Sequence, residues 1–585
     1  MAIRRNVAII GLGPRGTWAL ENFILELHQQ DQLRHIHLLL FEETGHYGNG
    51  KVYDTNQIQS NWINISERIL LLGERAKIDS PSCQIPAFPS YHSWANLDFD
   101  MILKEQADTY PPRAKIGAYL HQRFQSFIEP LVNVNLATLH TDKVEEVSVN
   151  VENKIQINTN LNFYKDIDEA LLTIGHQPTQ LSEQLSNWEK FANRNPNVTL
   201  YTAPYPIRQF INHEQLTEES KVGIRGFGLA MIDVVRSIAH KFGKFVTHDD
   251  KNKSCTYATS YNLKEMLIPF SLDGLPPVPK PINALVDEWY KPTAQQLRNF
   301  ETQIGNTLLQ QQAHNTDFLI QAFAPIAAET FIDLDQTYGH GHYITNEIEQ
   351  VITAWLRNND HEHATLMSVH QPVQKTIQEH ITMALGHHAI SLDYCVGQVW
   401  RYCQASIYKQ LSYNACTEEV FAEIIALDES TKRYSYGPPV ESMQQLLALI
   451  KADVMTTDMV NNPDFKLLDD GWYFSKDGKS ITADIMINSV LSAPQIKSVN
   501  SPLVKNMLSD ELIEAVHDDL GVSTDENGFL QSTKASNLPI ALLGRLAKGT
   551  IIGVDAILEC FGERPQKWAK QAAINHKKYI RNQRS

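Results

Sequence analysis

The first residues whose spacing could do chemistry form a glycine loop, Gly11-Leu12-Gly13-Pro14-Arg15-Gly16, directly after a short apolar run. In such a loop the first glycine permits a tight turn, and the second lets the backbone approach a pyrophosphate. The third allows the following helix to pack closely on the strand, with its N-terminus facing the anion. Arg15 adds a cation beside that anion. The loop therefore predicts a dinucleotide site.

The elements expected around this loop strengthen the prediction. A strand over 6–10, a helix over 17–29 and a second strand over 36–42 form one strand-helix-strand unit with a parallel sheet. An acid at the end of the second strand should accept hydrogen bonds from ribose hydroxyls, and Glu42 stands there with Glu43 as the alternative. A lone loop of this kind is weak evidence and can be an ordinary turn, but this context favours nucleotide binding.

A second, shorter glycine loop follows the strand expected at 221–224. Gly226 and Gly228 are followed by Leu229-Ala230 rather than by a third glycine, so an ordinary strand-to-helix turn is an alternative interpretation. In a chain that already has one nucleotide unit, we interpret the loop as an NAD(P)H site, with FAD in the first. Three cations could meet a 2′-phosphate, although each is more simply a solvated surface charge: Arg225, Lys251 and Lys253.

Composition limits the class of protein. The chain has 585 residues and 43% apolar content, and a single core stops growing at about 250–300 residues, so we expect two or three domains. The net charge of −16 disfavours nucleic acid and membrane surfaces as partners, and the basic stretch 576–584 reads as a solvated tail. The six cysteines show no regular spacing, which is typical of reduced thiols in a cytoplasmic protein. A small-molecule substrate is expected, and a homo-oligomer stays open.

These observations predict an α/β fold with two dinucleotide-binding, Rossmann-like domains and a mainly helical domain or insertion. Buried strands expected at 169–174 and 538–543 make the FAD domain discontinuous, and a helix over 549–562 is expected to end the fold. The expected boundaries are 1–210 for the first part of the FAD domain, 215–282 for the NAD(P) part, 283–470 for the helical region and 475–585 for the C-terminal part of the FAD domain.

Several further segments, in this order, resemble a known family. The chain is similar to the bacterial FAD–NAD(P)-binding family, which is related to flavin N-hydroxylases and includes amino-acid N-monooxygenases of the nitrosuccinate-forming type. Two positions depart from the family, Leu272 where an arginine is usual and Ala230 where a threonine is usual. Besides the two loops, the resemblance rests on 48–53 with Gln57 and Asn64, Pro112-Arg113 with 117–120, 173–178, Asp233, 273–276, 436–439 and 544–550.

The resemblance implies which residues bind the cofactors. Gly48 and Gly50 would let their loop pass close to the flavin or its pyrophosphate. Thr550 would begin the last helix, whose amides could stabilise negative charge at the N1–C2=O edge of the reduced flavin. The predicted cofactor-binding residues are Gly11, Gly13, Pro14, Arg15, Gly16, Glu42, Gly48, Gly50, Gly175, Gly226, Gly228, Gly544, Arg545, Gly549 and Thr550.

Two residues are candidates for catalysis, and each has a second interpretation. Asn64 could hydrogen-bond the flavin edge or a peroxide, or it could cap a loop. Arg113 could hold a substrate carboxylate with two parallel hydrogen bonds, or it could form a structural salt bridge. No metal is expected, because the spacing His340-Gly341-His342 has no identifiable third or fourth ligand.

The sequence and the resemblance together predict a flavin-dependent enzyme. We expect an FAD-dependent monooxygenase that uses NADPH or NADH and N-hydroxylates a small amine or amino acid through a flavin hydroperoxide. One alternative is a flavin NAD(P)H oxidoreductase that does not oxygenate. The other is a nucleotide-binding protein that has lost turnover, which the departures at Ala230 and Leu272 keep open.

Overall fold

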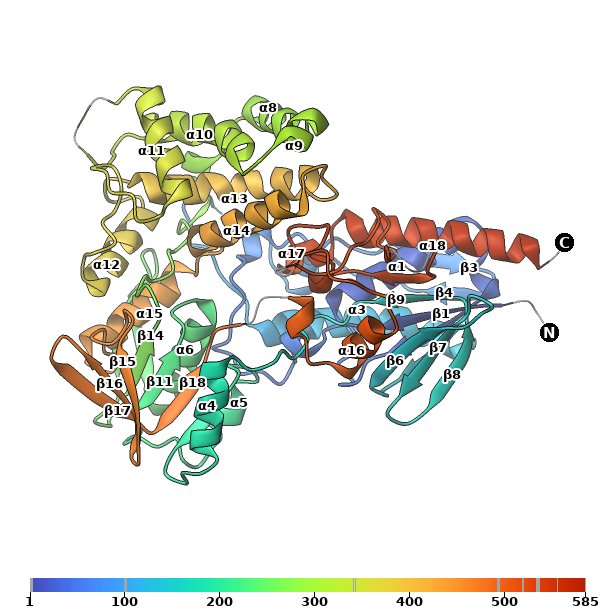
Figure 1. Ribbon diagram of the computed structural model, residues 1–585, viewed down its shortest axis with the longest axis horizontal. Helices are drawn as coiled ribbons and strands as arrows, with labels where there is room; N and C mark the ends of the chain where they lie inside the picture. The colour runs from blue at the N-terminus through green and yellow to red at the C-terminus, as the bar shows by residue number, and fades with distance from the viewer. Residues whose placement is uncertain are drawn as a thin grey trace.

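Two parallel sheets organise the molecule, and a mainly helical region lies on one side of them (Figure 1). The predicted fold class is therefore confirmed, including the discontinuity of the first domain. The computed structural model describes residues 4–98, 103–339, 341, 343–491, 495–517, 520–532, 537–554 and 556–583.

The first sheet is built from strands at both ends of the chain. Its parallel strands follow the order β19 (Ile540–Leu542), β9 (Glu169–Leu172), β1 (Arg5–Ile10), β2 (Ile36–Phe41) and β5 (Ala137–His140). Side chains alternate between the faces of a strand. Val7 and Ile9 accordingly join one buried cluster, and Ala8 and Ile10 join another.

Different elements cover the two faces of the first sheet. One face carries α1 (Pro14–Gln29), α3 (Arg113–Asn133) and α18 (Glu563–Asn582), and α1 and α18 run side by side (Figure 1). The other face carries an antiparallel sheet of β6 (Val144–Val149), β7 (Ile155–Thr159) and β8 (Phe163–Ile167), together with α16 (Pro502–Ser509). A long loop between β2 and α3 contains β3 (Ile78–Ser80), β4 (Cys83–Ile85) and α2 (Tyr91–Trp94).

The second sheet follows the order β10 (Thr199–Tyr201), β18 (Ile485–Asn488), β11 (Val222–Arg225) and β14 (Leu267–Phe270), all parallel. We expected 475–585 to lie wholly with the FAD domain, but β18 lies between β10 and β11, so the chain returns to the first sheet only after this strand. Around this sheet lie α4 (Glu183–Ala192), α5 (Arg208–Ile211), α6 (Leu229–Phe242), β12 (Lys244–Asp249), β13 (Ser254–Ala258), β15 (Asp464–Leu468), β16 (Gly471–Lys476) and β17 (Lys479–Ala483).

The stretch from 283 to about 451 is helical, whereas the predicted helical region extended to 470 and so included β15. Its largest buried side chains include Trp400 and Tyr394, which share a core with the helix that follows the second glycine loop. Its helices are α7 (Ala284–Asp287), α8 (Ala294–Ile304), α9 (Thr307–Gln312), α10 (Asp317–Ile332), α11 (Thr345–Arg357), α12 (Val373–Ala384), α13 (Leu392–Gln410), α14 (Glu418–Ser435) and α15 (Val440–Lys451).

The end of the chain differs from the prediction. The described residues between 549 and 554 form no helix, and the helices after them are α17 (Ile557–Cys560) and α18. The run Thr550-Ile551-Ile552 before Gly553 explains the difference, because β-branched residues and glycine are poor helix formers. The prediction that Thr550 begins the last helix is therefore wrong.

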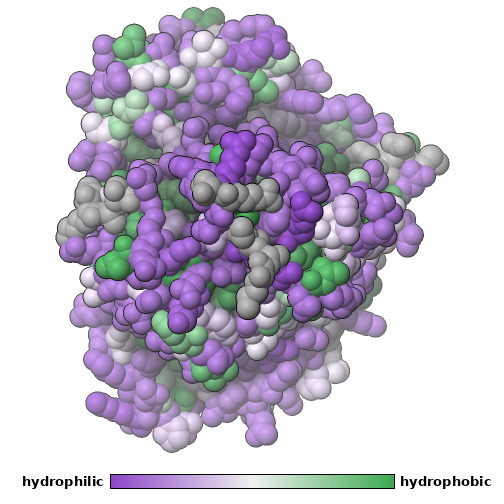
Figure 2. All heavy atoms as spheres, turned by 90° about the vertical axis from the view of Figure 1, so that its right-hand side faces the viewer, coloured by the Kyte–Doolittle hydropathy of each residue, from purple (hydrophilic) through white to green (hydrophobic). Residues whose placement is uncertain are grey.

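The surface is mostly polar where both termini emerge. Figure 2 shows hydrophilic residues over most of that face, with apolar side chains in small separate groups. Scattered apolar residues of this kind are normal on a folded domain. Within the described residues no helix is long and apolar enough to cross a membrane.

A buried ion network fixes α1 against α3 and so positions the first glycine loop. The Glu21 carboxylate on α1 accepts hydrogen bonds of 2.7 and 3.1 Å from Arg123 on α3. Its Oε2 also accepts one of 3.3 Å from Arg75. All three side chains are buried, so the two cations depend on this carboxylate for their compensation.

We expect Glu21→Gln to destabilise the protein by about 3–5 kcal/mol, because two buried guanidinium groups lose their counter-charge. Thermal and urea unfolding of the purified protein would measure this. Glu43→Gln is the control, since it removes an exposed pair with Lys51 worth about 0–1 kcal/mol. Equal unfolding of the two variants would contradict the expectation.

Candidate functional site

The first glycine loop is a place where three backbones meet. Gly11 has φ +93° and donates its N–H to Phe41 O at 2.8 Å, which turns the chain at the end of β1. A Cβ on Gly16 would lie 2.2 Å from Gly11 O and 2.5 Å from the Thr173 hydroxyl. The helix α1 can therefore approach the ends of β1 and β9 only because position 16 has no side chain.

The middle of the loop leaves room for a ligand to approach the main chain. A Cβ on Gly13 would have Gly50 Cα at 3.9 Å as its nearest atom, and the 48–50 loop lies directly against 11–13. Gly48 and Gly50 both have positive φ, and Gly48 donates to Leu12 O at 2.7 Å. No side chain caps the N-terminus of α1, so its first amides remain for an anion.

One orphaned atom lies in the same cradle. Asn49 is buried and donates through Nδ2 to Tyr53 O at 2.9 Å. Its Oδ1 is buried without a hydrogen-bond partner among the described residues. Buried polar atoms are normally paired, so this acceptor fits a site that a polar ligand completes. The cradle as a whole fits the pyrophosphate and ribose of FAD.

The structure separates the two candidate ribose acids. Glu42 is buried, and its carboxylate accepts from Leu12 N–H at 2.9 Å and from the Thr44 hydroxyl at 2.7 Å. Glu43 turns outward and pairs with Lys51 at 2.5 Å. Glu42 is therefore the acid that touches the loop, and its Oε2, which accepts only from Leu12 N–H among the described residues, keeps a second lone pair for a ribose hydroxyl.

The C-terminal segment closes over the first loop. Arg15 donates to Val554 O at 3.1 Å, and a Cβ on Gly544 would lie 2.5 Å from Arg15 Nη1. Gly544 needs its φ of +111° to make this approach. Arg15 was expected beside the pyrophosphate, and the structure shows that it also joins the two ends of the first domain.

Two further predicted residues lie where β9 and β19 end. Gly175 has φ +63°, and a Cβ there would meet no atom within 4 Å. Arg545 contacts the His176 ring at 2.5 Å. Gly175 and Arg545 therefore follow the carboxyl ends of β9 and β19, at the sheet edge that also carries the first glycine loop.

Gly549 and Thr550 serve the packing of this segment. A Cβ on Gly549 would lie 2.5 Å from Val522 O, and the Thr550 hydroxyl accepts from Thr524 N–H at 3.1 Å. Tyr413, which follows α13, donates its N–H to Thr550 O at 2.7 Å. Because Thr550 begins no helix, the predicted stabilisation by a helix N-terminus at this residue does not apply.

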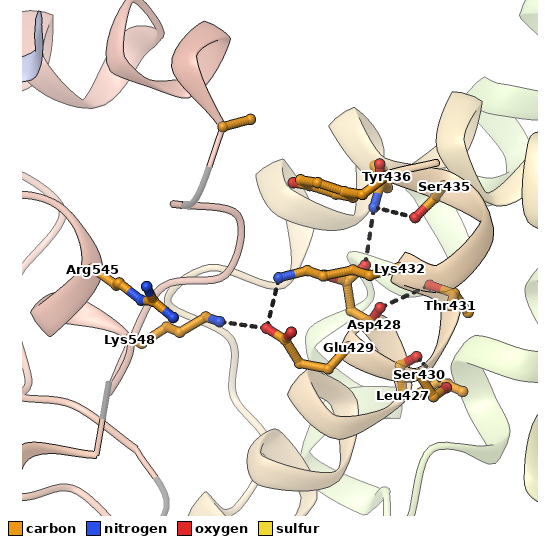
Figure 3. A network of polar contacts seen from close by, with 12 residues as sticks. Leu427, Asp428, Glu429, Ser430, Thr431, Lys432, Ser435, Tyr436, Arg545 and Lys548 are labelled. Carbon is orange, nitrogen blue, oxygen red and sulfur yellow. Dashed lines mark hydrogen bonds and ion pairs between the residues drawn. The ribbon is translucent and has the colours of Figure 1, made fainter. Parts of the chain in front are cut away.

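An ion pair fastens the same segment to the helical region (Figure 3). The Lys548 ammonium is buried and lies 2.6 Å from Glu429 on α14, which also pairs with Lys432 at 2.7 Å. Burial alone would raise the pKa of Glu429, but Lys548 and Lys432 hold it below the usual value. This ion pair thus attaches the helical region to the segment after β19, which closes over the first loop.

The second glycine loop has the same construction at the second sheet. Gly226 has φ +107° and donates to Phe270 O at 2.8 Å. Gly228 precedes α6, whose N-terminus has no side-chain cap, and a Cβ on Gly228 would meet no atom within 4 Å. This loop therefore leaves the backbone amides of α6 accessible to an anion.

The three candidate cations for a 2′-phosphate do not gather at this loop. Arg225 donates to Gln184 Oε1 at 3.0 Å and to Asn488 Oδ1 at 2.9 Å. Lys251 and Lys253 lie in the turn between β12 and β13. Arg225 alone directly precedes the loop, and its planar group is already used to hold β11 to β18.

The two candidate catalytic residues lie in different surroundings. Asn64 donates through Nδ2 to Tyr436 O at 3.1 Å, which links the long loop to the end of α14. Arg113 at the start of α3 pairs with Asp233 of α6 at 3.4 Å and donates to Asn61 at 3.2 Å. The structural salt bridge considered for Arg113 is thus present, and it joins the two sheets.

Asp233 is a residue to which the sequence assigned no role. It is buried, and the Tyr205 hydroxyl donates to it at 2.6 Å. Burial raises the pKa of this carboxyl, and Arg113 opposes the rise. Burial alone would lower the pKa of Arg113, but Tyr205 and Asp233 raise it. A single acid within the apolar stretch 229–235 of α6 was the available signal.

Possible metal ligands do not cluster in the part of the chain that the structure describes. No group of three or more His, Cys, Asp or Glu side chains there could hold an ion. His340 and His342, which have metal-like spacing, lie outside the described residues.

Comparisons with known proteins agree with the first site. Residues 8–177 match a protein family described as FAD-NAD(P)-binding. The resemblance predicted from the sequence is confirmed at that level for this segment, while its finer part stays a prediction. No curated protein matches the chain.

Among solved structures the chain is similar to L-lysine 6-monooxygenase from Pseudomonas syringae, with 13% identity, a TM-score of 0.46 and coverage of 98% of this chain and 99% of that one. It is also similar to cyclohexanone monooxygenase from Rhodococcus sp. Phi1 bound to NADP+, with 12% identity, a TM-score of 0.41 and coverage of 99% and 85%. Because both TM-scores are below 0.5, we assign no activity from these similarities.

Two glycines allow the nucleotide sites to be tested separately. We expect Gly13→Ala to weaken FAD binding and Gly228→Ala to weaken NAD(P)H binding, each about tenfold or more, because a methyl group would meet the ligand and no close protein atom. Isothermal titration with each dinucleotide would measure this. Gly73→Ala, also without a close neighbour, is the control. Loss of both ligands in either variant would contradict the separation of the sites.

The contact between Arg113 and Asp233 can be tested by a double-mutant cycle. We expect Arg113→Met and Asp233→Asn each to destabilise the protein and the double variant to lose less than their sum, with a coupling of about 0.5–3 kcal/mol. Urea unfolding measures the coupling. A coupling near zero would mean that Arg113 does not stabilise the contact between the sheets.

Proposed function

We propose that this protein is an FAD-dependent, NAD(P)H-using monooxygenase that N-hydroxylates a small amine or amino acid. The observation that carries the proposal is the pair of parallel sheets, each with a glycine loop that runs into an uncapped helix N-terminus. The match of residues 8–177 to an FAD-NAD(P)-binding family supports the assignment of FAD to the first loop. The second loop is then assigned to NADPH or NADH.

The residues that would hold FAD come from both ends of the chain. Gly13 and Gly50 leave room for the pyrophosphate, Glu42 offers carboxylate oxygens to the ribose, and Arg15 adds positive charge. Asn49 offers its buried acceptor. Bound FAD would supply the redox chemistry, which includes taking hydride from NAD(P)H and activating oxygen.

The protein's own task is to enclose the reacting groups and exclude water. The segment 552–554 is held by Arg564, which donates to Ile552 O at 2.6 Å and to Gly553 O at 2.7 Å. Tyr408 of α13 packs so closely on Gly553 that a Cβ there would lie 2.1 Å from its ring. The helical region therefore supports the wall of the site nearest the C-terminal segment.

The cysteines do not suit thiol chemistry as the fate of the electrons. All six are free, and none lies in a CxxC motif. Burial raises the pKa of each of these thiols. A redox-active thiol needs the thiolate form, so a disulfide-reductase mechanism has no suitable residue. Monooxygenase and simple NAD(P)H oxidase activity differ in their products, a hydroxylated amine in the first case and hydrogen peroxide alone in the second.

The test is a spectrum followed by a product assay. We expect the purified protein, reconstituted with FAD, to be yellow and to bleach when NADPH or NADH is added without oxygen. In air, with a panel of L-amino acids and primary alkylamines, we expect NAD(P)H consumption and a hydroxylamine product detected by mass spectrometry. Gly13→Ala is the matched variant. We expect it to lose the yellow colour under conditions in which the unaltered protein keeps it.

Three outcomes would decide between the alternatives. Failure to bind FAD would overturn the proposal and leave a different nucleotide-binding role. Bleaching with hydrogen peroxide as the sole product, whatever amine is added, would identify an oxidoreductase that does not oxygenate. Binding of both dinucleotides without any bleaching would identify a protein that has lost turnover.

A further inference from the structure

The second glycine loop is joined to its sheet by the same hydrogen bond as the first. In the first unit, Gly11 N–H donates at 2.8 Å to the O of Phe41, which ends β2. In the second unit, Gly226 N–H donates at 2.8 Å to the O of Phe270, which ends β14. In both units this strand pairs in parallel with the strand before the loop. The residues after Phe270 therefore occupy the place that the ribose acid Glu42 occupies in the first unit.

The segment after β14 carries an exposed carboxylate. Ser271 is the first residue after the strand, and its hydroxyl donates to Asp273 Oδ1 at 3.0 Å. The same Oδ1 accepts from Leu275 N–H at 3.1 Å, and Ser271 Oγ accepts from Gly274 N–H at 2.9 Å. These bonds hold the segment in a tight turn. Asp273 is exposed there, and its Oδ2 has no hydrogen-bond partner among the described residues.

No lysine or arginine in the described part of the chain makes a hydrogen bond or an ion pair with residues 271–275. Leu272 is 86% exposed within this turn. Arg225 precedes the glycine loop but donates to Asn488 at the end of β18, and β18 and β14 lie on opposite sides of β11. The strand end that follows β14 is thus acidic and apolar, without a contacting cation.

A cation does contact the chain just beyond this turn. Pro276 O accepts from Arg433 Nε at 2.9 Å, and Val278 N–H donates to Arg433 O at 3.0 Å. Arg433 belongs to α14, so these bonds hold the chain where it leaves the second sheet for the helical region. It is therefore the alternative anchor for a phosphate group at this edge of the sheet.

We propose that the second site takes NADH in preference to NADPH, an inference that rests on the proposed assignment of this site to a nicotinamide dinucleotide. In a strand-loop-helix-strand unit the adenosine ribose lies at the end of the second strand. A carboxylate there accepts from its 2′-hydroxyl, or an arginine meets a 2′-phosphate. The turn after β14 offers the Asp273 carboxylate beside the apolar Leu272. A 2′-phosphate would meet a like charge there, which disfavours NADPH.

The first experiment compares the two ligands without turnover. NAD+ and NADP+, which cannot reduce a flavin, are titrated calorimetrically into the full-length protein, with and without added FAD. We expect the Kd of NAD+ to be about tenfold or more below that of NADP+. Equal affinities, or tighter binding of NADP+, would overturn the inference and leave the proposed function standing. Binding of neither ligand would remove the assignment of the second loop, and this inference with it.

The second experiment changes the charge of the turn. Leu272→Arg adds a cation, and Asp273→Asn removes a negative charge but keeps an oxygen acceptor for the turn. We expect each to lower the ratio of the NADP+ Kd to the NAD+ Kd by about tenfold. The matched controls are Leu308→Arg on α9 and Asp335→Asn after α10, both exposed in the helical region, and they should leave the ratio unchanged. An unchanged ratio in both turn variants would contradict the inference.

The variant Arg433→Met tests the alternative anchor. If the turn sets the selectivity, this variant changes the Kd values of NAD+ and NADP+ alike or leaves both unchanged. A loss of about tenfold in NADP+ affinity alone would identify Arg433 as a phosphate anchor. The 2′-phosphate would then have a dedicated cation, and the inferred preference for NADH would be wrong.

Discussion

The close approach of Gly11, Gly16 and Thr173 is the constraint on which the first site depends. A single Cβ at position 16 would overlap Gly11 O at 2.2 Å, so α1 could not start where it does. The uncapped N-terminus of α1 then faces one edge of the sheet. The 48–50 loop and the segment after β19 lie at the same edge. The ligand-binding edge is thus set by backbone contact, and side chains such as Glu42 and Arg15 are added to it.

A second dependence links the helical region to this edge. The segment 544–554 lies between Arg15 on one side and α13 and α14 on the other, held by Arg564 and by the pair of Lys548 with Glu429. A movement of the helical region would therefore be transmitted to the wall of the first site through charge-assisted contacts, which are directional. The helical region is in this way attached to the segment that closes over the first glycine loop.

The local parts of the structure could be predicted from the sequence, and the parts set by distant contacts could not. The unit around 11–16 was predictable because its strand, loop, helix and acid are adjacent in the chain. The strand 485–488 is apolar on both faces, and such a run carries no information on which sheet it joins. Arg113 and Asp233 stand 120 residues apart, so their pairing could not be derived from the spacing of residues in the sequence.

Charged and aromatic side chains contribute to the contact between the two sheets. Besides the pair of Arg113 and Asp233, the Arg236 guanidinium lies 3.7 Å from the centre of the Trp62 ring. Arg236 stands one turn after Asp233 on α6, so one helix face carries both contacts. Because one face of α6 makes both contacts, the position of the second glycine loop relative to the first domain depends on charged and aromatic side chains of the helix that this loop begins.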